Sequence, residues 1–234
     1  MMAAKKRFYK TVLLADDGLS ILLDGQNLRS PTGSLLRLPT RSLASAIADE
    51  WRVQGDAIDP ATLPLFSLSV TVVDRVIPQR DAIIAELSAY GGNDLLCYRD
   101  DQDDLVSRQQ DQWQPWLDDL AKNRGITLQI VTGIMPICQA DAAQFPPLIS
   151  AYDDWRLGML HRATTLSGSL VLGLGFVDEV IDDERMFTLA FLDELWQNEK
   201  WGTDLEAAGR HECLRNELQD VARFLALLGD KAVT

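Results

Sequence analysis

Pairs of neighbouring carboxylates recur after residue 100 and are the residues best suited to chemistry. They are Asp103–Asp104, Asp118–Asp119, Asp153–Asp154, Asp182–Asp183 and Asp193–Glu194. If helices brought two pairs together, they could hold a divalent metal ion and support a carboxylate-based metal-dependent hydrolase. Asp pairs at helix starts also cap the helix and complement its dipole, and Asp182–Asp183 before "ERMF" fits that description. We therefore expect capping or solvation, with no metal and no cofactor, and keep the hydrolase as the alternative.

Other candidates for catalysis lack the spacing that their chemistry needs. The glycines of "GSLVLGLG" (168–175) have neither the Gly-Lys-Ser/Thr of a phosphate loop nor a dinucleotide-binding spacing, so they predict close helix packing. "HEC" at 211–213 lacks the second histidine of a zincin helix, and His161 is expected to be an ordinary helix histidine. Three widely separated cysteines predict neither a disulfide framework nor a zinc ribbon. These catalytic signals are all weak.

The stretch "FLDELWQNEKWGTDLEA" (191–207) places five carboxylates among large apolar residues. On a helix that starts at Glu184, Glu194 follows apolar residues at i−7, i−4 and i−3, and Asp193 lies over two more. An acid in such a setting must be paired, protonated or exposed on an apolar surface.

Three interpretations of these acids remain open. One is a salt bridge to an Arg or Lys of another helix, the second is an acidic contact inside an apolar partner-binding patch, and the third is a catalytic acid. Trp196 and Trp201 extend the apolar surroundings, and Gly202 is expected to end the helix.

The elements before residue 78 predict a small α/β domain. Residues 8–39 combine β-branched and aromatic residues with turn signals at Asp24–Gly25 and Pro31–Gly33, which predicts a meander of three or four short strands. Residues 40–55 then change to a helical period, with Thr40 or Ser42 as the N-cap and Gly55 as the stop.

After Pro78 the pattern is mostly helical, so we predict an α+β protein with domains at 1–78 and 79–234. Helices are expected over 79–91 and over 104–125, the second interrupted at Pro115. Residues 126–134 predict a strand, with the start of a buried helix as the alternative. Three or four helices should follow residue 146, over 147–166, 167–179, 182–202 and 204–229.

Charge is unevenly divided between the two predicted domains. Residues 1–78 contain nine Lys/Arg and eight Asp/Glu, whereas residues 79–234 contain thirteen Lys/Arg and twenty-seven Asp/Glu. Such an acidic surface repels phosphate backbones, so nucleic acid is not expected as a partner, whereas a basic protein surface is. No apolar run approaches the ~20 residues that cross a bilayer, so membrane insertion is not expected either.

Several motifs, in this order along the chain, resemble those of the ATP-twelve (ATP12) family, assembly chaperones of the F-one sector of ATP synthase. They are "KRFYK", "LDGQNLRSPTG", "LPTRSLASAIADEW", "PLFSL" followed by "VD", "YGGNDLLCYR", the Trp-x-Pro core of "QWQPWLDD", and "LDELWQNEKWGTDLEA". The resemblance covers residues 6–210. It implies an N-terminal α/β part, a C-terminal helical part and no enzymatic activity.

The resemblance also implies a client and a site. Members bind the unassembled α subunit of the F-one sector, keep it from aggregating and release it when the β subunit takes over the interface. The functionally important acid of the family falls on Glu194, with Asp193 beside it, and Gln197, Trp201 and Gly202 match the rest of the motif. Here Leu195–Trp196 stand where many relatives carry an acid or a polar residue followed by Phe or Trp.

We therefore predict a partner-binding site at Glu194, Asp193, Trp196, Gln197, Trp201 and Gly202. The chain is expected to be a monomer and to act in the bacterial cytoplasm, or else to be a processed mature form, with eukaryotic relatives in the mitochondrial matrix. A rival of another class is a structural protein that stays in a permanent complex.

Overall fold

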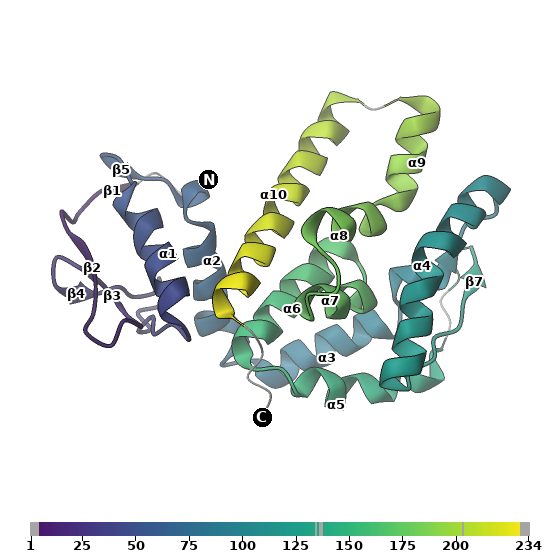
Figure 1. Cartoon of the computed structure of the whole chain (residues 1–234), viewed down its shortest axis with the longest axis horizontal. Coiled ribbons are helices and arrows are strands. Elements are labelled where there is room, and N and C mark those ends of the chain that lie inside the picture. Colours follow the sequence, from purple (N-terminus) through teal and green to yellow (C-terminus); the bar gives the residue numbers. More distant parts are fainter. Residues whose placement is uncertain (1–4, 134, 136–137, 203, 230–234) are drawn as a thin grey trace. The chain divides into compact units, whose positions relative to one another are not determined.

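The structure is a computed structural model that describes residues 5–133, 135, 138–202 and 204–229 (Figure 1). Contacts group the described residues into two compact units. Unit 1 contains residues 5–80 and 223–229, and unit 2 contains residues 81–222. The domain boundary that the sequence places at residue 78 stays a prediction.

Unit 1 contains the predicted meander. Strands β2 (Val12–Leu14), β3 (Ile21–Leu23) and β4 (Gln26–Asn27) form an antiparallel sheet in that order. Asp24 and Gly25 connect β3 to β4 with φ values of 49° and 83°, the positive values that a two-residue hairpin turn of type I′ requires. A second antiparallel pair joins β1 (Lys5–Lys6) to β5 (Ala57–Ile58). The prediction of three or four short strands is confirmed.

Helix α1 (Arg41–Arg52) packs beside this sheet and begins where the sequence predicts. The side chain of Thr40 accepts a hydrogen bond from the backbone N–H of Leu43 and donates one to the carbonyl of Leu227, at 3.1 and 2.7 Å. The second bond holds the end of α10 (Leu205–Leu228) within unit 1. One face of α1 is buried, as its helical period predicts.

Two of the motifs quoted above meet in unit 1. Helix α2 (Pro64–Thr71) follows a 3-10 turn, η1 (Pro60–Thr62), and continues into a π-helical turn, η2 (Val72–Val76). The carboxylate of Asp74 in that turn accepts hydrogen bonds from the hydroxyls of Ser30 and Thr32, at 2.8 and 2.6 Å. These bonds join the "VD" motif to "RSPTG".

Unit 2 is mainly helical and holds most of the chain's tryptophans. Its helices are α3 (Arg80–Gly91), α4 (Asp103–Arg124), α5 (Phe145–Ser150), α6 (Asp154–Ser167), α7 (Leu170–Val177), α8 (Asp183–Ala190), α9 (Leu192–Trp201) and the first part of α10. It also contains the 3-10 turns η3 (Leu95–Cys97) and η4 (Ala140–Gln144) and a short parallel pair, β6 (Tyr98–Arg99) with β7 (Val131–Thr132). The strand predicted over 126–134 is thus short, and residue 134 lies outside the described residues.

Helices α6 and α7 form the centre of unit 2 and pack closely through small residues. A Cβ added at Gly173 would lie 2.6 Å from the Thr164 hydroxyl, so no larger residue fits there without movement. Asp94 fixes the start of α7, because its buried carboxylate accepts from the Ser169 hydroxyl at 2.7 Å and the Val171 N–H at 3.0 Å. The packing role predicted for the glycines of 168–175 is confirmed for Gly173 and Gly175, whereas Gly168 ends α6 with a φ of 74° and has open space around it.

Helix α4 corrects one prediction, because it continues through Pro115. Proline removes one backbone hydrogen bond, but Trp113 and Leu117 on either side are buried. Burial of one face over the whole length of α4 outweighs that local loss. The helix ends at Gly125, which has the left-handed conformation typical of that position.

Two other predicted helices are each divided in two. The segment 147–166 breaks where Asp153 caps α6, accepting from the N–H groups of Trp155 and Arg156 at 2.8 and 2.9 Å. The segment 182–202 breaks at Phe191, between α8 and α9. There the indole N–H of Trp113 donates to the carbonyl of Leu189 at 2.9 Å. In a continuous helix that carbonyl would accept from the N–H four residues on.

Candidate functional site

The break at Phe191 places Glu194 in the first turn of α9, where it contacts α10. Its half-buried carboxylate pairs with the guanidinium of Arg210, and the same oxygen, Oε2, lies 2.9 Å from Nε2 of His211. The apolar stripe predicted from one continuous helix is therefore wrong for this residue. Of the three interpretations, the structure supports a paired acid, since Glu194 joins α9 to α10.

His211 is buried beside two aromatic rings that flank the break. Its ring centroid lies 5.3 Å from that of Phe187 and 5.8 Å from that of Phe191. One turn further along α10, the guanidinium of Arg215 lies 3.8 Å from the Phe187 ring centroid and 3.3 Å from the carboxylate of Glu184. Basic and aromatic groups together thus hold α8, α9 and α10 in one arrangement.

Asp193 faces the opposite neighbour, α4. Its Oδ1 accepts a hydrogen bond from Nε2 of Gln109 at 2.9 Å. Burial raises the pKa of Asp193, and the negative charge of Asp100 adds to that effect, whereas the Gln109 bond and the charge of Arg99 act against it. Adjacent acids of the motif therefore bind different helices, Asp193 to α4 and Glu194 to α10.

The far end of α9 is also fixed to α4. Both terminal nitrogens of Arg108 donate to the Glu199 carboxylate at 2.8 Å, a bidentate geometry. The ammonium of Lys200 lies 2.6 Å from Oδ2 of Asp104. These side chains are largely exposed, so water and salt screen the pairs and each adds little to stability; their effect is to set the position of α9.

The remaining predicted site residues differ in exposure. Trp196 is only 2% exposed and supports the motif from inside, whereas Trp201 is 70% exposed, with its ring centroid 5.5 Å from that of Trp196. Gln197 is exposed, and Gly202 ends α9 with a φ of 87°. Sequence reasoning missed Arg210, His211 and Gln109, and no local signal assigns them, because they lie 16, 17 and 84 residues from their partners.

The carboxylate pairs do not assemble into a metal site within the described part of the chain. No group of three or more His, Cys, Asp or Glu side chains there could hold a metal ion. Asp153 and Asp182 instead cap helices α6 and α8, as the capping interpretation predicts.

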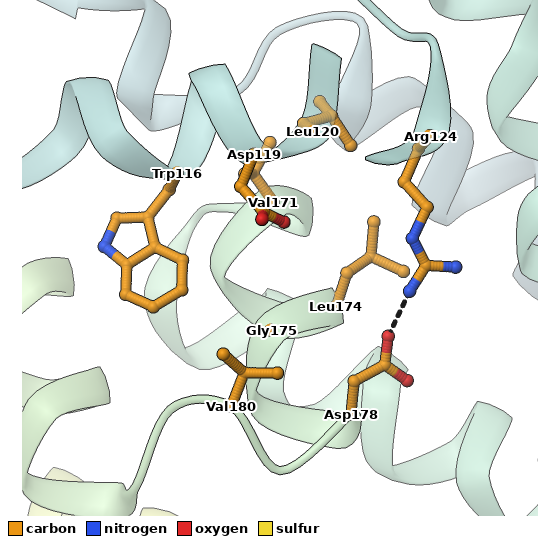
Figure 2. Close-up of a pocket in the computed structure, with 9 residues that line it drawn as sticks. All are labelled: Trp116, Asp119, Leu120, Arg124, Val171, Leu174, Gly175, Asp178 and Val180. Carbon is orange, nitrogen blue, oxygen red and sulfur yellow. Dashed lines mark hydrogen bonds and ion pairs between the residues drawn. The ribbon is translucent and has the colours of Figure 1, made fainter. Parts of the chain in front are cut away.

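One small pocket lies between α4 and the end of α7 (Figure 2). Its volume is about 60 Å³, far below the ~300 Å³ at which small-molecule sites begin. Figure 2 shows the ion pair between Arg124 and Asp178 at one side, and Tyr152 donates a hydrogen bond to the same Asp178 carboxylate at 2.9 Å. Burial raises the pKa of Tyr152, so its hydroxyl stays protonated and acts as a structural donor.

None of the described helices combines the length and the apolarity that crossing a bilayer requires. In unit 2, ion pairs to α4 and α10 fix a partly exposed α9.

Known proteins share both the sequence and the fold of this chain. The family model described as "ATP12 chaperone protein" matches residues 6–121. Mitochondrial Atp12 of Schizosaccharomyces pombe is 25% identical over 236 residues, which cover 93% of this chain and 81% of that protein. The match to the family model ends before the 191–207 stretch, but the match to the yeast protein spans most of the chain.

Solved structures match over nearly the whole length. The crystal structure of Atp12 from Paracoccus denitrificans has a TM-score of 0.88 and 36% sequence identity, and covers 96% of this chain and 98% of that chain. A chaperone-like protein from Agrobacterium tumefaciens has a TM-score of 0.86 and 35% identity, and covers 95% and 86%. The α+β fold is the one these structures share. The chain belongs to the ATP12 family, a family of chaperones and not of enzymes.

Proposed function

We propose that this protein is an assembly chaperone of the F-one sector of ATP synthase. It binds the unassembled α subunit, prevents that subunit from aggregating and releases it when the β subunit replaces it. The observation that carries this proposal is the match to Atp12 of Paracoccus denitrificans over almost the entire length of both chains. We infer action in the cytoplasm of a bacterium, as a monomer.

A chaperone of this kind meets a physical need. A subunit that awaits a permanent partner exposes a large apolar interface, which is an aggregation hazard. The chaperone must cover that surface and still release it, so its affinity must be modest. A few apolar anchors ringed by charge suit this task, because the charges speed encounter while adding little to the tightness of the complex.

We infer that the client-binding region includes α9. Asp193 and Glu194 bind α9 to α4 and α10, and Gln197 is exposed on its surface. Trp196 supports the helix from within, and Trp201 and Gly202 form its end. The ion pairs to α4 and α10 keep this helix in place before the client arrives. A prearranged surface loses less conformational entropy on binding than a loose one does.

Size-exclusion chromatography of this protein with separately refolded α and β subunits from the same source tests the proposal. We expect a discrete complex with α alone that dissolves when β is added. A complex that keeps this protein after β joins would indicate a permanent structural component. No complex with either subunit, under conditions where α alone aggregates, would contradict the proposal.

A further inference from the structure

Two of the most exposed apolar side chains of unit 2 lie where α9 ends and α10 begins. Trp201, the last residue of α9, is 70% exposed, and Leu205, the first residue of α10, is 93% exposed. In Figure 1 this end of both helices lies at the edge of the unit, away from α5 and α7. A single exposed leucine is ordinary, but tryptophan is one of the residue types that contribute most to binding energy at interfaces, and here it lies four residues from a second exposed apolar residue.

The exposed tryptophan has a firm support. Its ring meets that of buried Trp196 edge to face, with centroids 5.5 Å apart and planes at 87°. The ammonium of Lys200 lies 5.3 Å from the Trp196 ring centroid and also pairs with Asp104 of α4. Trp201 thus has one buried aromatic neighbour, while most of its surface remains in water. A tryptophan has only two side-chain torsions, so it loses little side-chain entropy when a partner covers it.

The surroundings of these two residues are acidic. Residues 192–206 contain five carboxylates and one lysine, and residues 100–104 contain four aspartates and no basic residue. The ion pair between Lys200 and Asp104 places the second segment beside the first and neutralises that lysine. Asp101 and Asp103 are exposed in the 100–104 segment, and Asp204 and Glu206 are exposed on either side of Leu205 in the chain. A partner that covers the apolar pair must carry positive charge at its edge, because a second acidic surface would be repelled.

We propose that Trp201 and Leu205, with the acids of 100–104 and 204–206, form a docking surface for an apolar segment of the client that is flanked by Lys or Arg. We call it the Trp201–Leu205 surface. The inference rests on the proposed function and makes it specific. The client contacts the residues where α9 ends and α10 begins, and Glu194 contributes indirectly by holding the two helices together. Trp201 and Leu205 bind the apolar residues of the client segment, and the acids favour a segment that has Lys or Arg on either side.

Binding of the full-length protein to the refolded F-one α subunit, measured as a dissociation constant, tests this surface. Trp201→Ala and Leu205→Ala should each weaken binding, the tryptophan change by about tenfold or more, whereas Trp201→Phe should retain most of the affinity. Val180→Ala is the matched control, because Val180 is also 70% exposed in unit 2 but lies beside the pocket of Figure 2. It should bind α like the unchanged protein.

The acids have a separate readout. Asp204→Asn with Glu206→Gln should lower the association rate and flatten its dependence on salt between about 0.05 M and about 0.5 M. Circular dichroism and the melting temperature of each variant are recorded as well. We expect small changes, because these side chains are exposed and because asparagine can still accept the hydrogen bond that Asp204 accepts from the N–H of Ala207.

The outcomes separate this inference from the proposed function. If the unchanged protein binds α and the Trp201 and Leu205 variants bind equally well, the surface lies elsewhere and the inference fails alone. If these variants lose a dimer of this protein but keep α binding, the surface serves self-association and the inference also fails. If the unchanged protein does not bind α at all, the proposed function fails first.

Discussion

The carboxylate oxygen Oε2 of Glu194 lies 2.9 Å from Nε2 of His211, although 17 residues separate them in the chain. The same oxygen pairs with Arg210, so one carboxylate contacts two adjacent residues of α10. The acid at the centre of the 191–202 motif thus makes its contacts within the protein. Any effect of Glu194 on a client passes first through the position of α9 relative to α10.

A double-mutant cycle of Glu194→Ala and His211→Ala should show that these residues act together. We expect a coupling of about 1 kcal/mol in the free energy of unfolding, because Glu194→Ala already removes the carboxylate that contacts buried His211, so the second change cannot remove that contact again. Urea unfolding of the four proteins measures it. A parallel cycle of Glu194→Ala with Arg29→Ala, whose guanidinium bonds only locally to Gly33, should be additive within ~0.5 kcal/mol. Equal coupling energies in both cycles would contradict a specific interaction between Glu194 and His211.

Glu194→Gln should weaken binding of the F-one α subunit several-fold. Glutamine keeps an acceptor for His211 but removes the charge that holds Arg210, so the first turn of α9 becomes less well fixed to α10. Glu212→Gln is the control, since it removes the same charge from an exposed site one residue after His211. Calorimetric titration over a range of salt concentrations gives the comparison. If Glu194→Gln bound like the unchanged protein at every salt concentration, the proposed role of this acid would be wrong.

Gly173→Ala should destabilise the protein by about 1–3 kcal/mol, because the new methyl group must displace the Thr164 hydroxyl from the contact between α6 and α7. Gly209→Ala is the opposite case. No atom lies within 4 Å of a Cβ at that position, and the residue is exposed inside α10, so alanine should stabilise the helix by about 0.5–1 kcal/mol. Thermal unfolding of both variants checks the signs, and a stable Gly173→Ala protein would show that α6 and α7 are loosely packed.

Asp94 should make stability depend on pH. Burial raises the pKa of its carboxyl group to about 6 in spite of the hydrogen bonds that it accepts. Because the folded-state pKa is the higher one, the folded protein binds the proton more tightly. The contribution of Asp94 to the free energy of unfolding therefore falls as pH rises from its ordinary value of 3.8 through about 6.

Asp94→Asn removes this titration. Urea unfolding at each pH measures the free energy of unfolding of both proteins. The value for the unchanged protein minus that for the variant should be larger near pH 4 than near pH 7. The control is Asp101→Asn, which changes an exposed aspartate in the same unit and should leave the pH profile unaltered. A difference that stayed constant over this interval, or grew toward pH 7, would contradict the assignment to Asp94.

The sequence by itself determined the features that depend on near neighbours. The Asp24–Gly25 turn, the Thr40 and Asp182 caps and the end of α9 at Gly202 all rest on contacts within a few residues, so their residue types suffice to predict them. The change from an alternating to a helical period likewise predicted a small sheet followed by a helical region. The composition of 191–202 also marked this stretch as a candidate site, because acids among aromatic residues must be paired, protonated or exposed.

Only the tertiary structure decided how that motif is built. Helical periodicity favoured one helix through Phe191, but the Trp113 indole, 76 residues away from Leu189, bonds to the carbonyl where the helix breaks. That break turns Glu194 toward Arg210 and His211. Packing also decided that Trp196 is buried and Trp201 exposed, which two tryptophans five residues apart do not reveal. Each of these outcomes depends on which distant segments meet, and near-neighbour preferences contain no information about that.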